Sequence, residues 1–234
     1  MKRAIISSVF LFALAVAACF SNSKSDVKET RDVSGFTKVS FGVSGDLYIN
    51  LGSEFSVVLE GDRSLLENIE TDVSGGKLVI KKRNQRWNIN EKVTVYIIMP
   101  EVRGVAVSGS GKAEIRDAVK TDDLNLSVSG SGKLFTSDLV VTNIDCSISG
   151  SGDIILMGNG NITNGDLSIS GSGNYRGETA KIGSLGISIS GSGSCICNVA
   201  ESLKASVSGS GSVTYLGNPK VDARISGSGR VRSK

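Results

Sequence analysis

Apolar and polar residues alternate with a period of two along much of the chain. Such alternation places every second side chain on the same face of an extended strand, so it predicts β-strands with one buried face. Clusters of Gly, Asn and Asp separate the alternating segments, and one helical turn is expected at residues 64–67. In the first hundred residues, strands are expected at residues 36–41, 46–51, 56–59, 77–80 and 92–99.

The second half of the chain repeats the tetrapeptide Ser-Gly-Ser-Gly seven times, from the copy at Ser108 to the copy at Ser226, at spacings of 18 to 21 residues. The residue before each copy is Val or Ile, and the residues three before and five after the first serine are apolar or Tyr. A flexible Gly/Ser linker has no reason to keep apolar residues in this phase. Each repeat therefore predicts a strand, a tight turn and a second strand.

Both glycines of each copy are predicted to be structural, because glycine permits positive φ and close approach of backbones at a tight turn. The predicted turn glycines are Gly109, Gly111, Gly130, Gly132, Gly150, Gly152, Gly171, Gly173, Gly191, Gly193, Gly209, Gly211, Gly227 and Gly229.

One repeat cannot bury its own apolar face, but repeats stacked about 4.8 Å apart share one continuous core. The fold class predicted is therefore all-β, as a right-handed parallel β-helix (a β-solenoid) of about seven coils. A small N-terminal β-strand region should be continuous with it, and a meander of hairpins is the alternative. The polar positions between the apolar columns form an outward serine column at Ser127, Ser147, Ser168, Ser188 and Ser206.

The N-terminus has the form of a secretory signal. Lys2 and Arg3 precede an uncharged, mostly apolar run that is too short to span a bilayer comfortably. The run ends in Val-Ala-Ala before Cys19, which resembles the lipobox of bacterial lipoproteins, so Cys19 is the predicted lipidation site. Phe20 supplies no Asp-type signal for inner-membrane retention, which favours the outer membrane of a Gram-negative bacterium. Ordinary cleavage after Ala17 would instead leave a soluble secreted protein.

These patterns divide the chain into four segments. We expect a lipoprotein signal peptide at residues 1–18, a tether at 19–31, the N-terminal β region at 32–100 and the repeat solenoid at 101–234.

Composition narrows the chemistry. The chain has 26 Lys and Arg, 23 Asp and Glu, and no histidine. Removal of the signal leaves a net charge near zero, so nucleic acid is not an expected partner. The absence of histidine excludes a Ser-His-Asp triad and most zinc chemistry. Cys146, Cys195 and Cys197 fit neither a zinc site nor a disulfide framework and are expected to be buried free thiols, so no metal and no cofactor are predicted.

No catalytic residues are predicted either. Polysaccharide-cleaving β-helical enzymes line an exposed sheet with carboxylates, whereas the exposed position four residues after each first serine is mostly basic or neutral here. That position is occupied by Lys112, Lys133, Asp153, Asn174, Ser194, Ser212 and Arg230. Five other aspartates, Asp122, Asp123, Asp138, Asp145 and Asp166, are expected near turns between coils.

Two surface segments are candidates for contacts. Arg83, Arg86 and Trp87 form the candidate contact surface, because an exposed Trp among basic residues can stack on a sugar or dock a partner. The basic residues of the last coil are expected to protect the open end of the solenoid from stacking. These are Arg224, Arg230, Arg232 and Lys234.

The mature chain resembles the family described as putative auto-transporter adhesin, head GIN domain, over about residues 31–232. The resemblance lies in residues 36–41, 46–49, 57–62 and 76–80, and most specifically in residues 93–111, where a strand ending in Met-Pro leads into the first Ser-Gly-Ser-Gly. It implies a β-helical superhelix with Gly-Ser-Gly turns, a Gram-negative envelope location and a role in adhesion. It supplies no catalytic residues.

The function expected from the sequence is that of a non-catalytic, lipid-anchored cell-envelope protein that presents a rigid solenoid to a protein or glycan ligand. The membrane is contacted through the lipid anchor. The first alternative is a structural assembly module that stacks or forms a homo-oligomer through its solenoid, and the second is a polysaccharide-cleaving enzyme.

Overall fold

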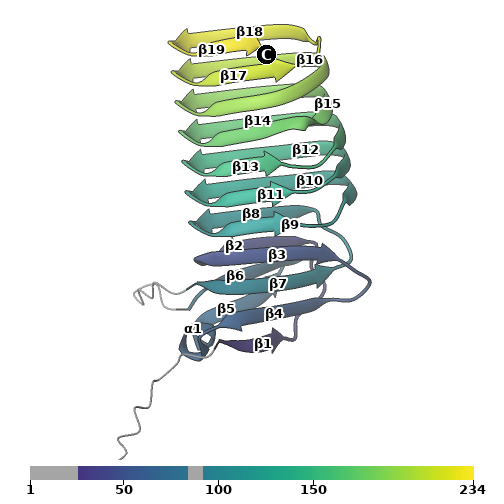
Figure 1. The fold of residues 1–234 in the computed structure, drawn as a ribbon, viewed down its shortest axis with the longest axis vertical. Helices are drawn as coiled ribbons and strands as arrows, with labels where there is room; N and C mark the ends of the chain where they lie inside the picture. The colour runs from purple at the N-terminus through teal and green to yellow at the C-terminus, as the bar shows by residue number, and fades with distance from the viewer. Residues whose placement is uncertain (1–25, 84–91) are drawn as a thin grey trace, which may run out of the picture.

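The computed structural model describes residues 26–83 and 92–234, which form a tall stack of strands with one short helix (Figure 1). The N-terminal elements are β1 (Val27–Arg31), β2 (Lys38–Gly42), β3 (Gly45–Leu51), β4 (Ser56–Gly61), α1 (Arg63–Glu67), β5 (Ile69–Ser74), β6 (Lys77–Lys82) and β7 (Val93–Met99). The repeats supply β8 (Gly104–Gly109), β9 (Lys112–Ile115), β10 (Val119–Gly130), β11 (Lys133–Thr136), β12 (Leu139–Gly150), β13 (Asp153–Leu156), β14 (Gly160–Gly171), β15 (Asn174–Gly191), β16 (Ser194–Gly209), β17 (Ser212–Leu216), β18 (Lys220–Gly227) and β19 (Arg230–Ser233).

The repeats form a right-handed parallel β-solenoid, as predicted (Figure 1). Strands before the Ser-Gly-Ser-Gly corner pair in parallel from β8 through β10, β12, β14, β15 and β16 to β18. Strands after the corner pair in parallel from β9 to β19. The hairpin meander is therefore wrong, since a meander requires antiparallel neighbours.

The register places equivalent residues of successive repeats directly on top of one another. Val128 pairs with Ile148, and Ile148 with Ile169. The apolar columns point inward and are almost fully buried, so they form one core that runs through the stack. The core also contains Tyr175, the largest of the fully buried side chains, at 1 % exposure.

The two glycines of each corner serve different needs. The first has positive φ in every copy, from 87° at Gly109 to 121° at Gly191, a region that other residues occupy only at a cost. The second lies where a side chain has no room: a Cβ added to Gly132 would come within 2.7 Å of both Gly111 O and Val107 Cγ1. One glycine is thus required by conformation and the other by the space inside the corner.

The N-terminal region closes one end of the solenoid. β2 and β3 add a parallel coil below β8 and β9, and β6 and β7 add the next. Beyond them the pairing becomes antiparallel, with β7 to β4, β4 to β1 and β6 to β5. Helix α1 begins at the expected helical turn, where the Asp62 carboxylate accepts a hydrogen bond from the backbone N–H of Ser64 at 2.8 Å.

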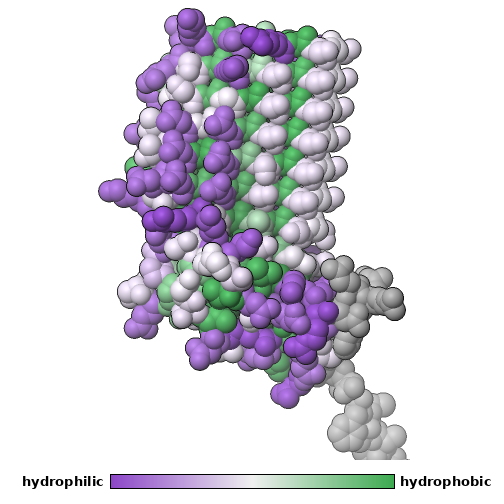
Figure 2. Space-filling view, turned by 180° about the vertical axis from the view of Figure 1, so that it is seen from behind, coloured by the Kyte–Doolittle hydropathy of each residue, from purple (hydrophilic) through white to green (hydrophobic). Residues whose placement is uncertain are grey.

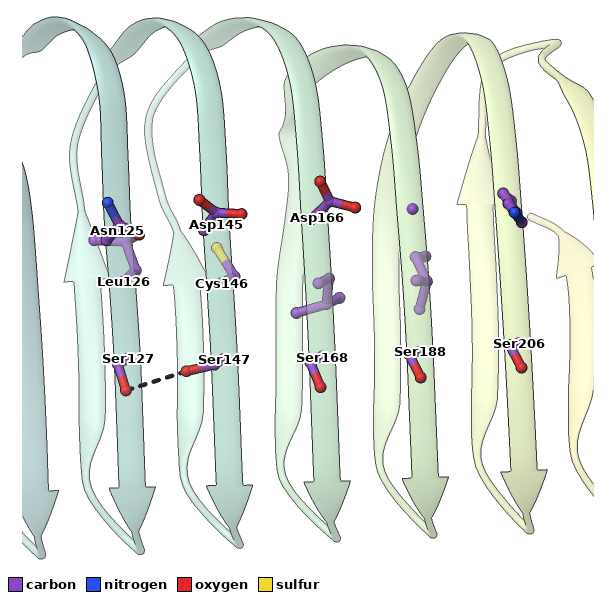
Figure 3. A pocket seen from close by; sticks show the side chains of 14 residues that line it. Asn125, Leu126, Ser127, Asp145, Cys146, Ser147, Asp166, Ser168, Ser188 and Ser206 are labelled. Carbon is purple, nitrogen blue, oxygen red and sulfur yellow. Dashed lines mark hydrogen bonds between the residues drawn. The ribbon is translucent and has the colours of Figure 1, made fainter.

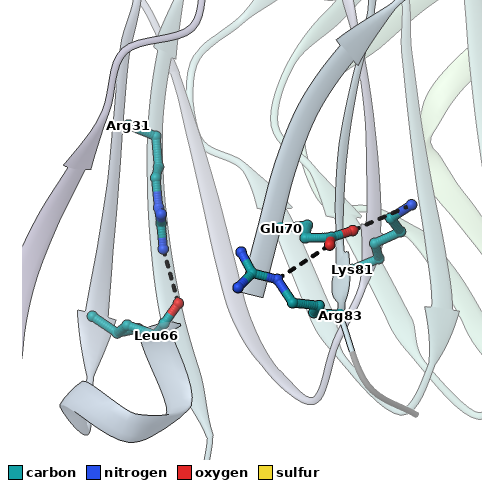
Figure 4. A network of polar contacts seen from close by, with 5 residues as sticks. All are labelled: Arg31, Leu66, Glu70, Lys81 and Arg83. Atoms are coloured by element: carbon teal, nitrogen blue, oxygen red, sulfur yellow. Dashed lines mark hydrogen bonds and ion pairs between the residues drawn. The ribbon is translucent and has the colours of Figure 1, made fainter. Parts of the chain in front are cut away.

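The expected tether extended too far toward the C-terminus. Its last five residues, Val27–Arg31, form β1, which pairs with β4 along its whole length. Arg31 Nη2 also donates a hydrogen bond to the carbonyl of Leu66 in α1 at 2.8 Å, which ties β1 to the helix (Figure 4). The short Val-Lys-Glu-Thr-Arg segment carries too little alternation to be recognised as a strand from its sequence.

The other end of the stack is less covered. On β18 the inward side chains Val221 and Ile225 are 38 % and 45 % exposed, whereas equivalent residues one coil earlier are buried. Among the described residues, β18 and β19 each pair with a strand on one side only.

Candidate binding face

The face of the solenoid that lies before the Ser-Gly-Ser-Gly corners is formed by β10, β12, β14 and the C-terminal parts of β15 and β16. We call it the serine face. It carries the predicted serine column and a second column that begins each corner, at Ser129, Ser149, Ser170, Ser190 and Ser208. The serines of both columns are half-buried or exposed, so the outward orientation expected for the first column is observed. Figure 2 shows the result as pale stripes of small polar residues between apolar stripes along the upper part of the molecule.

A shallow groove of about 540 Å³ crosses five strands of the serine face, from β10 to β16. Its walls and floor come from three columns: the predicted serine column, the inward column one residue before it, and a third column two residues before the serines. The last column consists of Asn125, Asp145, Asp166, Gly186 and Lys204. Because the central residues are serines, the groove stays open to a ligand lying along the stack (Figure 3).

Gly186 leaves a gap in the outer column. A Cβ added at this position would come within 2.6 Å of Asp166 Oδ1, so the carboxylate of Asp166 occupies the space beside Gly186. Lys204 follows on the next strand. The outer column therefore changes from acidic at β12 and β14 to basic at β16.

The positions of Asp145 and Asp166 correct the sequence-based prediction. Both were expected near turns, but they lie inside β12 and β14, are exposed, and pair with each other across the parallel ladder. Their side chains project from the same face, one rung apart (Figure 3). Asp is typical of turns, but here β12 and β14 are long enough to contain both residues, because their parallel neighbours extend the pairing on either side.

The neighbouring column, on the far side from the serines, is a hydrogen-bonded ladder. Asn143 Nδ2 donates to Asp123 Oδ1 at 2.9 Å, and Asn164 Nδ2 donates to Asn143 Oδ1 at 3.1 Å. The Asp123 carboxylate therefore has a hydrogen-bond donor within the chain. Asp145 and Asp166, by contrast, have no hydrogen bond or ion pair to the described residues.

The opposite sheet carries the column four residues after each first serine, and its polar groups satisfy one another. Lys133 Nζ lies 3.1 Å from Asp153 Oδ2, Asn174 Nδ2 donates to Asp153 Oδ1 at 2.8 Å, and Ser194 Oγ donates to Asn174 Oδ1 at 2.5 Å. As expected from the sequence, this column is not a ladder of carboxylates.

Next to it, near the N-terminal end, Tyr48 and Tyr96 stack with ring centroids 5.7 Å apart. The Arg116 guanidinium lies 3.7 Å from the Tyr48 ring centroid. Because the Arg116 guanidinium covers one face of the Tyr48 ring, that face is not free to stack on a ligand.

The predicted contact surface is described only in part. Arg83 is exposed, and its Nε lies 3.2 Å from Glu70 Oε1, while Lys81 Nζ lies 3.5 Å from Glu70 Oε2 (Figure 4). Arg86, Trp87 and the predicted lipidation site Cys19 lie outside the described residues.

The three thiols lie in the core. Cys146, Cys195 and Cys197 are free and buried. Burial raises the pKa of the Cys146 thiol, with a smaller contribution from the Asp145 carboxylate, and raises that of Cys195. Because a raised pKa suppresses the thiolate, Cys146 and Cys195 behave as small apolar core residues. In residues 26–83 and 92–234, no cluster of three or more His, Cys, Asp and Glu side chains could hold a metal ion.

None of the helices among the described residues has the length and apolar character needed to cross a membrane.

Similar solenoids occur among solved structures. A putative adhesin from Bacteroides fragilis superposes with a TM-score of 0.84 at 24 % identity, covering 91 % of this chain and 98 % of that one. A putative adhesin from Parabacteroides merdae gives 0.72 at 22 % identity, with 91 % and 97 % covered. A protein from Parabacteroides distasonis described as a putative lipid binding protein gives 0.70 at 20 % identity, with 91 % and 98 % covered. At these identities the likeness establishes the fold alone.

A search of curated proteins finds no match to the sequence. The model of one protein family does match, over residues 35–219, which include the N-terminal strands β2 to β7 and six of the seven Ser-Gly-Ser-Gly corners. The match confirms the resemblance that the sequence showed: the chain belongs to the family described as putative auto-transporter adhesin, head GIN domain.

Proposed function

We propose that the protein is a non-catalytic binding protein of the cell envelope, anchored by a lipid on Cys19, which presents the groove of the serine face to an extended ligand. The family is one of adhesin-like proteins, which suggests an envelope or surface location. The observation that carries the proposal is the groove itself, since it crosses five rungs of a rigid sheet and is open along its length. A ligand that contacts several rungs at once gains many weak contacts without any ordering of the protein.

An anchor at Cys19 would keep the N-terminal end of the solenoid near the membrane. The eight residues from Cys19 to Asp26, before β1 begins, can span at most about 29 Å. The seven coils of the repeat rise a further 34 Å or so at the usual strand spacing of about 4.8 Å. The groove lies on the side of this stack, beyond the N-terminal coils, so a ligand outside the membrane could reach it. Protease shaving of intact cells tests this arrangement: resistance of the protein would place it on the periplasmic face of the outer membrane and remove adhesion as its role.

Binding at the groove is tested with one substitution and one matched control. Ser168 lies in the middle of the groove, and Ser168→Phe fills it with a bulky ring. Ser74 is an exposed serine at the end of β5, in the N-terminal region, so Ser74→Phe adds the same ring elsewhere. On a panel of polysaccharides and envelope proteins, we expect Ser168→Phe to lose the binding that the wild type and Ser74→Phe retain. Equal binding by all three proteins would refute the groove as the binding site.

A polysaccharide-cleaving enzyme is a second candidate, and it is favoured by one observation. Asp145 and Asp166 lie on neighbouring rungs, and retaining glycosidases place two carboxyl groups about 5–5.5 Å apart. Both residues are exposed on an open groove, however, whereas catalysis of this kind works in a site from which water is largely excluded. The same polysaccharide panel, monitored for new reducing ends, decides between binding and cleavage. If the wild type produced reducing ends and Asp145→Asn did not, the protein would be an enzyme and the proposed binding function would be wrong.

Self-association through the last coil is a further candidate, because Ile225 exposes an apolar side chain beside the free edge of β18. Arg224, Arg230 and Arg232 on the same coil oppose it through like-charge repulsion. Sedimentation velocity over a hundredfold concentration range tests this candidate, and an unchanging monomer would eliminate it.

A further inference from the structure

The charges in the groove are not balanced by the protein. Asp145 and Asp166 lie on adjacent rungs of the parallel ladder, about 4.8 Å apart at the usual strand spacing. Like charges on neighbouring strands destabilise a sheet. Two carboxylates of the opposite sheet, by contrast, have a basic partner: Asp153 is paired with Lys133, and Glu114 with Lys112.

The nearest basic group of the same column does not neutralise the acidic pair. Lys204 is two rungs from Asp166, with Gly186 between them, and no ion pair joins the two side chains. A cation supplied by a ligand at β12 and β14 would therefore gain the attraction of two carboxylates at once. This charge complementarity indicates a ligand with positive groups rather than a neutral or acidic one.

The rest of the groove is suited to hydroxyl groups. Ser147, Ser168, Ser188 and Ser206 line it at one hydroxyl per rung. A serine hydroxyl both donates and accepts hydrogen bonds, as sugar hydroxyls do. Ser147 Oγ already donates to Ser127 Oγ at 3.1 Å, while the described residues provide no such hydrogen bond between the other serines of this column (Figure 3).

The sheet topology disfavours an extended peptide at the same place. Peptides commonly bind sheets by adding a strand to a free edge. β12 and β14 are interior strands with parallel partners on both sides, so their backbone groups are already paired. Only side chains remain to bind a ligand on this face.

We infer that the groove binds an amine-bearing glycan whose chain lies along the solenoid axis, with its ammonium groups at Asp145 and Asp166 and its hydroxyls along the serine column. This inference rests on the proposed binding function of the groove and specifies the ligand class. Lys204 disfavours ammonium groups on its own rung of the groove, at β16.

The test compares two oligosaccharides that differ only in charge. One is a glucosamine hexamer with free amino groups, and the other is its fully N-acetylated counterpart. Binding of each to the purified protein is measured at low salt, with the double variant Asp145→Asn/Asp166→Asn and the control Asp72→Asn. Asp72 is an exposed aspartate of β5, distant from the groove. Circular dichroism melts verify that the three proteins are equally folded.

We expect the wild type and the control to bind the free-amine hexamer more tightly than the N-acetylated one. The double variant should lose about 2- to 30-fold in affinity for the free-amine hexamer, the range for two solvent-exposed ion pairs. The loss should shrink as salt is added. Lys204→Gln should raise the affinity, because it removes a repelling charge.

Three results would overturn the inference. Equal binding of both hexamers by the wild type would refute the preference for amines. If Ser168→Phe abolished that equal binding, the groove would still be the binding site, and only the inferred ligand class would be wrong. Hexalysine that binds as tightly as the free-amine hexamer, with the same dependence on the two aspartates, would assign the groove to cationic peptides. A Lys204→Gln variant with reduced affinity would show that an anionic group of the ligand contacts this end.

Discussion

Replacement of Gly150 by Ala tests the physical account of the solenoid corners. Gly150 has a φ of 113°, and a Cβ added to it would lie 2.6 Å from Gly130 O in the coil below. The same oxygen accepts the hydrogen bond of the Ser151 backbone N–H at 2.9 Å. The substitution thus combines backbone strain with an overlap against a hydrogen-bond acceptor.

Gly109 provides the matched control. It is the equivalent glycine of the first Ser-Gly-Ser-Gly, with a φ of 87°, and a Cβ added to it would have no atom within 4 Å. Gly109→Ala therefore carries the backbone strain without the overlap. A residue held in an unfavourable φ/ψ region costs about 1–3 kcal/mol, and forcing an extra carbon into packed surroundings costs about 1–3 kcal/mol more. We expect Gly109→Ala to lose the first amount and Gly150→Ala to lose both.

Thermal unfolding by far-UV circular dichroism measures the difference. In a domain of 150–250 residues, 1 kcal/mol shifts Tm by about 2–4 °C, so the two variants should differ by roughly 2–12 °C. A repeat stack can lose cooperativity, so the amide exchange rate of Ser151 supplies a local measurement. It should rise in Gly150→Ala and stay unchanged in Gly109→Ala. Equal melting of both variants, with an unaltered Ser151 amide, would refute the stacking contact as the reason for glycine at this position.

Three further outcomes are expected. Tyr175→Ala should lose about 3–5 kcal/mol in urea unfolding, because it empties the largest fully buried site of the core; a loss below 1 kcal/mol would show that the core collapses around the cavity. Thr136→Val should gain about 1 kcal/mol, because the buried Thr136 Oγ1 has no hydrogen-bond partner among the described residues, and a destabilised variant would reveal a partner for this hydroxyl. The raised pKa of the Cys146 thiol means that the unfolded chain loses this proton first, near its ordinary pKa of 9.0. The free energy of unfolding should therefore be constant below that pH and fall as the pH rises above it. The fall should be less steep in Cys146→Ala. Identical pH dependence of the two proteins between pH 8 and pH 10 would contradict the raised pKa of Cys146.

Much of the solenoid could be predicted from local pattern. The columns around Val128, Ile148 and Ile169 identified the inward face, because strand periodicity is a property of neighbouring residues in the chain. The regular spacing of the glycine corners gave the parallel stack, since equal repeats can bury their apolar faces only against one another. The helical turn of α1 followed in the same way from a short local motif.

The N-terminal cap could be predicted only in part. β1 has no strong pattern of its own and is held by β4, a partner distant in sequence. β5 forms a tight hairpin with the neighbouring β6, but its own residues carry too little apolar alternation to indicate a strand. Arg31 illustrates the point, since its hydrogen bond to Leu66 joins residues 35 positions apart.

The amino-acid sequence by itself determined the strands, their inward faces, the glycine corners and the stack. The tertiary structure alone decided which exposed residues share a surface. Asp145 and Asp166 are 21 residues apart and become neighbours only because two repeats stack in register, with the gap at Gly186 and the charge of Lys204 on the following rungs. Strand pairing is a non-local interaction, so the groove and its charge pattern emerge from the register of the coils and from no single segment.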